Sequence, residues 1–239
     1  MALLEICIDT PAGLAAAVTG GADRVELCSA LALGGLTPTP GLIALAARAP
    51  LPVMAMIRPR AGGFDWSATE VEAMEAEIAA ISAAGLAGVV LGATRTAPDG
   101  TVTLDLPVME RLMQAARGLD VTLHRCIDLM QDPLTAIDQS AALGVSRILS
   151  SGGAATAPEG ADRLAAMMAH AGDRITIMPG AGVSAATLPG LLARLAPAEV
   201  HASASLPDPA TGAIAAFGFQ PPGAKRTDAA TVAALKGLL

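Results

Sequence analysis

Eight short apolar runs recur along the chain, and segments with the features of helices separate them. The runs are rich in Val, Ile, Leu, Met and Ala, and most end near a glycine, a proline or a polar residue, as β-strands do. They cover residues 4–8, 24–28, 53–58, 88–92, 121–126, 147–151, 174–178 and 199–203. Strands that alternate with helices favour a parallel sheet, and eight such repeats predict an α/β fold, a single (β/α)8 TIM barrel forming one domain over residues 1–239.

The segments between the runs carry helix start signals. Thr10 and Asp132 each precede a proline, the pattern of a cap followed by proline at the first helical position. Ser67 and Glu70 have the spacing of a capping box. Three further caps are expected at Asp105, Ser184 and Asp228. The rival fold, a doubly wound nucleotide-binding sheet, needs a glycine fingerprint after its first strand, and "CIDTPAGLAAA" has none.

The composition excludes several classes of function. The chain is 53% hydrophobic and has a formal net charge of −7, so we expect neither nucleic acid nor an anionic membrane as a partner. Glycines and prolines interrupt the uncharged stretch 27–47, which therefore predicts no membrane span. The N-terminal "MALLEICIDT" lacks the basic start of an export signal. We therefore expect a cytoplasmic location, with the three cysteines as reduced thiols.

Strand alternation predicts an unusually polar barrel interior. In each strand the plainly apolar phase should face the helices, so the opposite phase should face inward. The residues expected inside are Glu5, Cys7, Asp9, Glu26, Cys28, Met56, Arg58, Thr122, His124, Cys126, Met178, His201 and Ser203. Buried charges need partners. Many of these polar residues fall near the carboxyl ends of the strands, where barrel enzymes place their active sites.

Two inward histidines are the candidate catalytic groups. His124 or His201 would act as general acid or base, with Glu5 or Glu26 as its partner. The alternative is that both histidines are hydrogen-bonded members of a polar core.

Arginines and glycine-rich loops indicate a possible anion site. Arg58 and Arg60 could clamp an anionic group, and "SSGGAATA" and "MPGAGVSAATL" could offer backbone N–H groups after the sixth and seventh strands. The candidate anion-binding residues are Arg58, Arg60, Arg125, Asp128, Ser151, Gly152, Gly180, Gly182 and Ser203. Alternatively, the glycines only turn the chain. The long segment 204–227 could be a lid, an oligomer contact or a floppy insertion.

The pattern Glu-x-Cys occurs on the first two predicted strands, ending at Cys7 and Cys28. These strands should be neighbours, so the two sulfur atoms could form a soft site for Cu(I), or for Zn(II) with added nitrogen ligands. Cys126 should lie across the barrel and suits such a site less well. The alternative is that each cysteine is a small buried hydrophobic residue.

Several blocks together resemble the copper homeostasis protein CutC family. They are "LEICIDTPAGLAAAVTGGADRVELCSALALGGLTPTPGLI", "MIRPR", "HRCID", "ILSSGG" and "HASA", and they span nearly the whole chain. The resemblance implies a TIM barrel, a cytoplasmic location and a role in copper handling, with Cys7 and Cys28 as candidate Cu(I) ligands. The chain departs from the family pattern at Cys126, where the family usually has alanine, and at Leu123, where it usually has phenylalanine.

Two functions follow as hypotheses. The first is Cu(I) binding and handling in copper homeostasis, with no other cofactor expected. The second is a barrel enzyme of unknown reaction that acts on a small anionic metabolite, such as a phosphorylated one, at the carboxyl ends of the strands. In either case we expect a homo-oligomer and favour a dimer.

Overall fold

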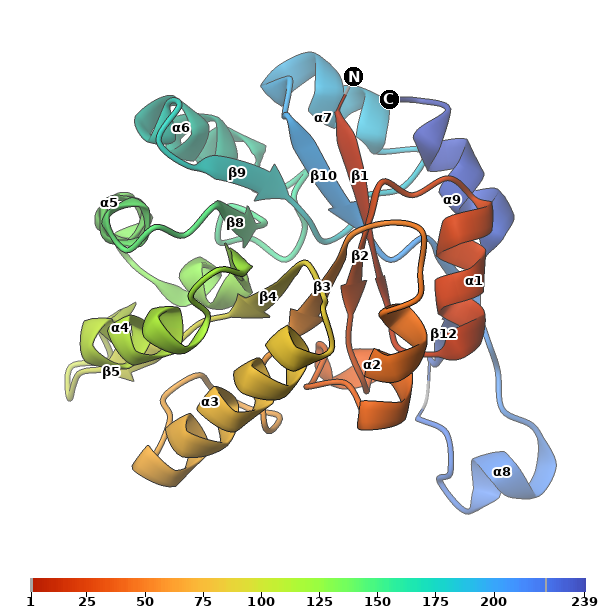
Figure 1. Ribbon diagram of the computed structural model, residues 1–239. Coiled ribbons are helices and arrows are strands. Elements are labelled where there is room, and N and C mark those ends of the chain that lie inside the picture. Colours follow the sequence, from red (N-terminus) through yellow and green to blue (C-terminus); the bar gives the residue numbers. More distant parts are fainter. Residues whose placement is uncertain (1, 222) are drawn as a thin grey trace.

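An eight-stranded parallel sheet forms the centre of the computed structural model, which describes residues 2–221 and 223–239 (Figure 1). The strands are β1 (Leu3–Ile8), β2 (Arg24–Leu27), β3 (Val53–Met56), β4 (Gly88–Leu91), β7 (Asp120–Leu123), β8 (Arg147–Ser150), β9 (Thr176–Pro179) and β10 (Glu199–Ala202). Their order is β10-β1-β2-β3-β4-β7-β8-β9, and the two end strands lie side by side. The sheet is therefore a nearly closed barrel, and the predicted (β/α)8 fold is confirmed.

A helix follows each barrel strand and covers the outside of the sheet (Figure 1). These helices are α1 (Pro11–Thr19), α2 (Pro40–Ala46), α3 (Ala68–Ala83), α4 (Leu106–Ala115), α5 (Pro133–Ala142), α6 (Ala161–Ala171), α7 (Leu188–Leu195) and α9 (Ala229–Lys236). Most predicted caps form, including the complete capping box of Ser67 and Glu70. The cap expected at Ser184 is wrong. Ser184 and Thr187 instead exchange side-chain to backbone hydrogen bonds in a turn before α7. Within the described residues, no helix has both the length and the apolar character that crossing a bilayer requires.

The strand side chains divide into two layers, as the alternation predicted. The outward residues of β1, Leu4, Ile6 and Ile8, belong to one large core cluster with the apolar faces of the helices. Each such buried aliphatic side chain contributes about 1.5–3 kcal/mol by leaving water. A second, small apolar cluster lies on the inward phase and consists of Cys28, Met54, Met56 and Val90.

An ion-pair network of inward side chains occupies the amino-terminal part of the barrel. Arg24 pairs with both Glu5 and Glu199. Arg147 pairs with Glu199 at 3.1 Å and with Asp120 at 2.6 Å. Because every charge in this set faces an opposite charge, the penalty for burying them is largely offset. Glu5 is the member nearest the carboxyl end, so the network supports the site described below.

Two hairpins extend beyond the barrel elements. β5 (Thr94–Thr96) pairs with β6 (Val102–Leu104), and β11 (Ser205–Pro207) pairs with β12 (Lys225–Thr227). The second hairpin includes the short helix α8 (Gly212–Ala216), which projects away from the barrel (Figure 1). Short 3-10 helices, η1 (Leu31–Leu33) and η2 (Arg125–Leu129), follow β2 and β7.

Candidate functional site

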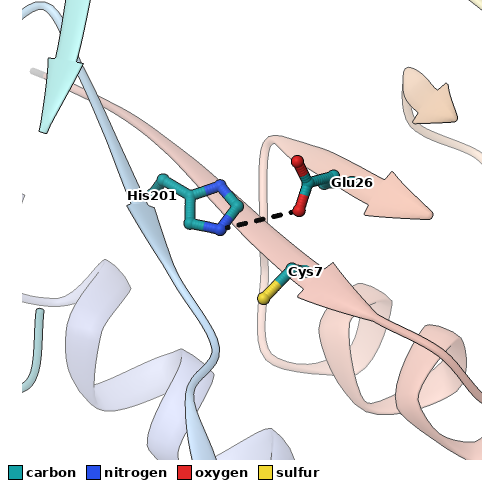
Figure 2. Close-up of side chains that lie close together, drawn as sticks. All are labelled: Cys7, Glu26 and His201. Atoms are coloured by element: carbon teal, nitrogen blue, oxygen red, sulfur yellow. Dashed lines mark ion pairs between the residues drawn. The ribbon is translucent and has the colours of Figure 1, made fainter. Parts of the chain in front are cut away.

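Three side chains that could bind a metal ion come together from neighbouring strands (Figure 2). Cys7 lies on β1, Glu26 on β2 and His201 on β10, and one ligand atom from each lies within 4.8 Å of the other two. The strand register explains the meeting, since Cys7 is directly opposite Glu26 and the neighbouring inward residue Glu5 is opposite His201. All three side chains are buried.

A carboxylate behind the site orients His201. The imidazole Nδ1 is 2.9 Å from Glu5 Oε1, and Nε2 is 3.7 Å from Glu26 Oε2. Metal-binding histidines are commonly held in this way, with the second ring nitrogen on a carboxylate. Burial alone would lower the pKa of His201, but the neighbouring Glu26 and Cys7 hold this pKa well above its ordinary value. A metal ion must therefore displace a proton to bind Nε2.

Glu26 has one oxygen atom without a partner. Its Oε1 is buried and accepts no hydrogen bond from any described residue, while Oε2 is 3.6 Å from the Cys28 thiol. Burial raises the pKa of Glu26, and the nearby negative charge of Glu5 adds to this effect. A buried oxygen without a partner costs about 1–3 kcal/mol, which a bound cation or water molecule would relieve. The donor set therefore fits a metal ion.

The three cysteines are free thiols in different surroundings. Cys7 belongs to the ligand group, whereas Cys28 lies outside it and contacts only its Glu26 member by a hydrogen bond. Burial raises the pKa of Cys28 well above its ordinary value, and the Glu26 carboxyl adds to the rise. Cys126 packs in the outer core cluster, and burial raises its pKa as well. Among the described residues, the structure groups Cys7 with Glu26 and His201, and Cys28 is joined to the same Glu26 carboxyl by its hydrogen bond.

Arg58 and Arg60 are engaged by protein groups. The buried Arg58 guanidinium donates to three backbone carbonyls, those of Leu33, Gly35 and Gly62. Arg60 pairs with Glu70 and donates to carbonyls of its own loop. Both arginines therefore brace the loops after β2 and β3, and neither lines the cavity described below.

His124 lies on a different wall of the barrel from His201, at the end of β7. Its Nδ1 accepts a hydrogen bond of 3.3 Å from the Cys126 backbone N–H, and its Nε2 has no partner among the described residues. The ring packs against Phe64 with 4.6 Å between centroids. Burial, assisted by the charge of Arg58, lowers the pKa of His124 to about 3. His124 is therefore buried and neutral at physiological pH, and it does not line the cavity described below.

A cavity of about 380 Å³ opens at the carboxyl ends of the strands, beside the ligand group. Cys7 and His201 line it, together with three of the predicted anion-binding residues, Arg125, Gly182 and Ser203. The expectation that Ser203 faces the barrel interior is wrong. β10 ends at Ala202, so Ser203 is exposed on the cavity wall. Asp9 is likewise only half-buried and accepts a hydrogen bond from the Leu31 backbone.

The loop after β9 gives this cavity a wall of backbone groups. Ala181 and Gly182 both have left-handed conformations, with φ of 70° and 71°. A left-handed alanine is strained, and such strain is concentrated at functional sites. No hydrogen bond between described residues uses the backbone N–H of Gly182 or Val183. Gly180 serves packing, since a Cβ there would lie 2.5 Å from Leu149 and 3.2 Å from His201.

Asp128 organises the rim of the cavity. Its carboxylate pairs with Arg125 at 2.8 Å and accepts hydrogen bonds from the Ser150 hydroxyl at 2.6 Å and the Ser151 backbone N–H at 3.0 Å. Arg125 also donates to the Ser151 hydroxyl at 2.6 Å. The next residue, Gly152, allows close packing, because a Cβ there would lie 2.3 Å from a carbonyl oxygen at the start of α6. Asp128, Ser151 and Gly152 therefore shape the rim and are not among the cavity-lining residues.

The fold and the site define a class of protein, a (β/α)8 barrel with a buried thiol–carboxylate–imidazole group beside a cavity at the strand ends. The family model described as CutC family matches residues 2–206. A family protein CutC from Sinorhizobium medicae is 52% identical over 238 residues, which cover 99% of this chain and 96% of that relative. The chain belongs to the CutC family.

Solved structures agree with this placement. A CutC crystal structure from Streptococcus agalactiae, whose name refers to copper homeostasis, matches with a TM-score of 0.78 and 31% identity. The match covers 85% of this chain and 99% of that one. N-(5'-phosphoribosyl)anthranilate isomerase from Pyrococcus furiosus matches with a TM-score of 0.58 but only 12% identity, covering 100% of this chain and 98% of that one. The second likeness shows the shared barrel fold alone.

Proposed function

We propose that the protein binds Cu(I) as its cargo in copper homeostasis, with Cys7, Glu26 and His201 as the ligands. The observation that carries this proposal is the set of three ligand atoms within 4.8 Å, beside a Glu26 oxygen that has no partner. A thiolate and an imidazole suit Cu(I), and the carboxylate makes Zn(II) the main competitor. Membership of the CutC family adds support. Three free thiols also suit a reducing compartment, so we place this activity in the cytoplasm.

Proton release should accompany binding. The imidazole of His201 is held in its protonated form by its neighbours, and the thiol must also lose its proton to act as a ligand. Affinity for Cu(I) should therefore rise with pH and fall in acid. Glu5 keeps Nε2 directed at the site throughout, since its own hydrogen bond is to Nδ1.

The test is a Cu(I) titration of the reduced protein against a competing chelator, with three serine variants. Removal of a direct ligand should weaken binding by more than about 100-fold, because loss of an outer partner alone weakens it by about 10–100-fold. We expect this loss for Cys7→Ser and wild-type affinity for the control variant Cys126→Ser. Cys28→Ser should retain most of the affinity, whereas a two-cysteine site predicts equal loss in Cys7→Ser and Cys28→Ser. Wild-type affinity in Cys7→Ser would overturn the proposed site.

The cavity supports a second candidate function, an enzyme that acts on a small anionic metabolite. Besides His201, the residues that line the cavity include two charged side chains, the cations Arg125 and Lys225. Backbone N–H groups of the loop after β9 are available to an anion, as in many barrel phosphate sites. His201, backed by Glu5, would be the general acid or base.

Calorimetric titration with inorganic phosphate and simple sugar phosphates would test this second candidate. Binding should weaken at least about tenfold in Lys225→Ala, since a charged hydrogen bond contributes about 1.5–3 kcal/mol. The exposed Arg95→Ala is the matched control and should bind as the wild type does. Binding that is absent in the wild type, or equal in Lys225→Ala, would count against an anion site in this cavity.

A further inference from the structure

The segment between β10 and α9 forms an arm, defined here as residues 205–221 and 223–227. Its stem is the β11–β12 ladder, and its tip contains α8. Phe217 and Phe219 are 71% and 80% exposed at the tip, and Ile214 is 52% exposed. Two of the three phenylalanines of the chain are thus exposed together, with their rings edge to face at 5.9 Å between centroids. A cluster of exposed aromatic side chains is a mark of an interaction surface.

The arm is anchored at its stem and free at its tip. β12 lies against α1, while α8 points away from the barrel (Figure 1). The high exposure of both phenylalanine rings agrees with this direction. The tip therefore does not bury its apolar side chains on its own barrel.

An apolar groove of about 410 Å³ lies between α1 and α2 on the same side of the molecule. Its walls include Leu14 and Val18 of α1 and Leu45 of α2, and Leu45 is itself 40% exposed. The single ionic residue in the groove lining is Arg48, which is exposed and forms no ion pair with any described residue.

The arm tip, residues 208–221 and 223–224, carries a charge opposite to that of the groove, whereas the cations Lys225 and Arg226 lie in the stem. Asp208 is the single ionic residue of the sequence from 208 to 224, and in the described part of the chain it forms no ion pair. The arm tip therefore presents two aromatic rings and one negative charge, and the groove presents apolar walls and one positive charge. The tip and the groove are therefore both apolar and carry opposite charges.

We infer that the arm tip of one protomer lies in the α1–α2 groove of a second copy, and that a two-fold dimer exchanges both arms. The stem and the groove share α1, so both surfaces lie on one side of the molecule and two copies can engage reciprocally. Four buried phenylalanine rings would remove roughly 600–1,000 Å² from water. The groove surfaces that these rings cover add to this area, which then approaches the roughly 1,200 Å² at the lower limit of a stable interface. This inference is independent of the proposed metal function.

Analytical ultracentrifugation of the full chain tests the assembly. The wild type should sediment as a dimer. The arm variant Phe217→Ser/Phe219→Ser and the groove variant Leu45→Glu should each sediment as monomers with unchanged far-UV circular dichroism. Leu129→Ser removes an exposed apolar side chain elsewhere and should leave the dimer intact. A monomeric wild type, or a dimer unaffected by both variants, would overturn the inference.

Mixing experiments distinguish arm exchange from other contacts. The arm variant retains its groove and the groove variant retains its arm, so an equimolar mixture should form heterodimers that neither variant forms alone. Phe219→Cys mixed with Leu45→Cys should give a disulfide between two chains under mild oxidation. A double cysteine variant that cross-links within one chain would show instead that the arm closes over its own barrel, and would refute the exchange.

Discussion

At the scale of single residues, the two buried histidines show how neighbouring side chains determine the protonation state of an imidazole. His201 faces two carboxyl groups and a thiol, which favour its charged form. His124 packs against Phe64, and its burial, together with the charge of Arg58, favours its neutral form. His201 lies in β10 and His124 directly follows β7, and the side chains that surround the two rings differ. The charged form is therefore favoured in His201 and the neutral form in His124.

The neutral state of His124 predicts a loss of stability in mild acid. The unfolded chain takes up a proton at this histidine below its ordinary pKa of 6.5, whereas the folded chain does so only near pH 3. Its contribution is therefore complete above pH 6.5 and is lost as pH falls from 6.5 toward 3. Between pH 7.5 and 5 the loss should be about 2 kcal/mol.

Urea unfolding at pH 7.5 and pH 5 measures this loss. In His124→Leu the stability difference between the two pH values should shrink by about 2 kcal/mol, whatever the variant's absolute stability. The exposed Arg95→Ala should retain the wild-type difference. An unchanged difference in His124→Leu would show that other groups cause the acid sensitivity.

At the scale of elements, the loop after β8 depends on one carboxylate. Asp128 joins η2 to this loop through hydrogen bonds to Ser150 and Ser151, and it holds Arg125 at the cavity rim. The glycines of the loop permit its close turn against α6 but supply no attraction. The rim therefore keeps its shape through a side chain that lies about 20 residues earlier in the chain.

Removal of this carboxylate should destabilise the protein more than removal of an ordinary helix cap. We expect Asp128→Ala to reduce the free energy of unfolding by about 3 kcal/mol, because charge-assisted hydrogen bonds to a buried acceptor are lost. The matched control is Asp132→Ala, which removes the cap of α5 and should reduce it by about 1 kcal/mol. Chemical denaturation compares the two variants. Equal losses would mean that the loop holds its shape without Asp128.

At the scale of the whole molecule, a charge network ties strands together across the barrel interior. Glu5, Arg24 and Glu199 come from three neighbouring strands, and Arg147 extends the network to β8. Burial of such charges is acceptable only while every member keeps its partner.

Loss of one cation should therefore be costly. Arg24→Met leaves Glu5 and Glu199 facing each other without their shared partner, and the free energy of unfolding should fall by about 3–5 kcal/mol. Arg174→Met breaks an exposed pair with Asp138 and should cost less than about 1 kcal/mol. Thermal and urea unfolding would measure both. A small effect of Arg24→Met would show that the remaining partners, Arg147 of Glu199 and His201 of Glu5, suffice for the two carboxylates.

Much of the fold could be predicted from the sequence, because the signals for strands and helix caps are local. Apolar alternation and caps identified the eight strands and most helix starts. Arg24 and Arg147 share the inward phase of Glu26 and Leu149, yet they escaped notice because each stands at the first position of its strand. The grouping of Cys7 with His201 depends on barrel closure, which places β10 beside β1. Cys7 and His201 are 194 positions apart, and this spacing does not indicate that the two residues meet.

β12 connects the cavity with the arm. Lys225 at its start lines the cavity, and the same strand forms the stem from which the arm extends. A ladder of three residue pairs joins β12 to β11, so a displacement of the arm stem would also displace the backbone of Lys225 beside the cavity. If both proposals hold, ligand binding in the cavity and docking of the arm are coupled through this hairpin, and each changes the affinity of the other by the same factor. Because docking of the arm requires a second copy, retention of the ligand would then depend on the concentration of the protein.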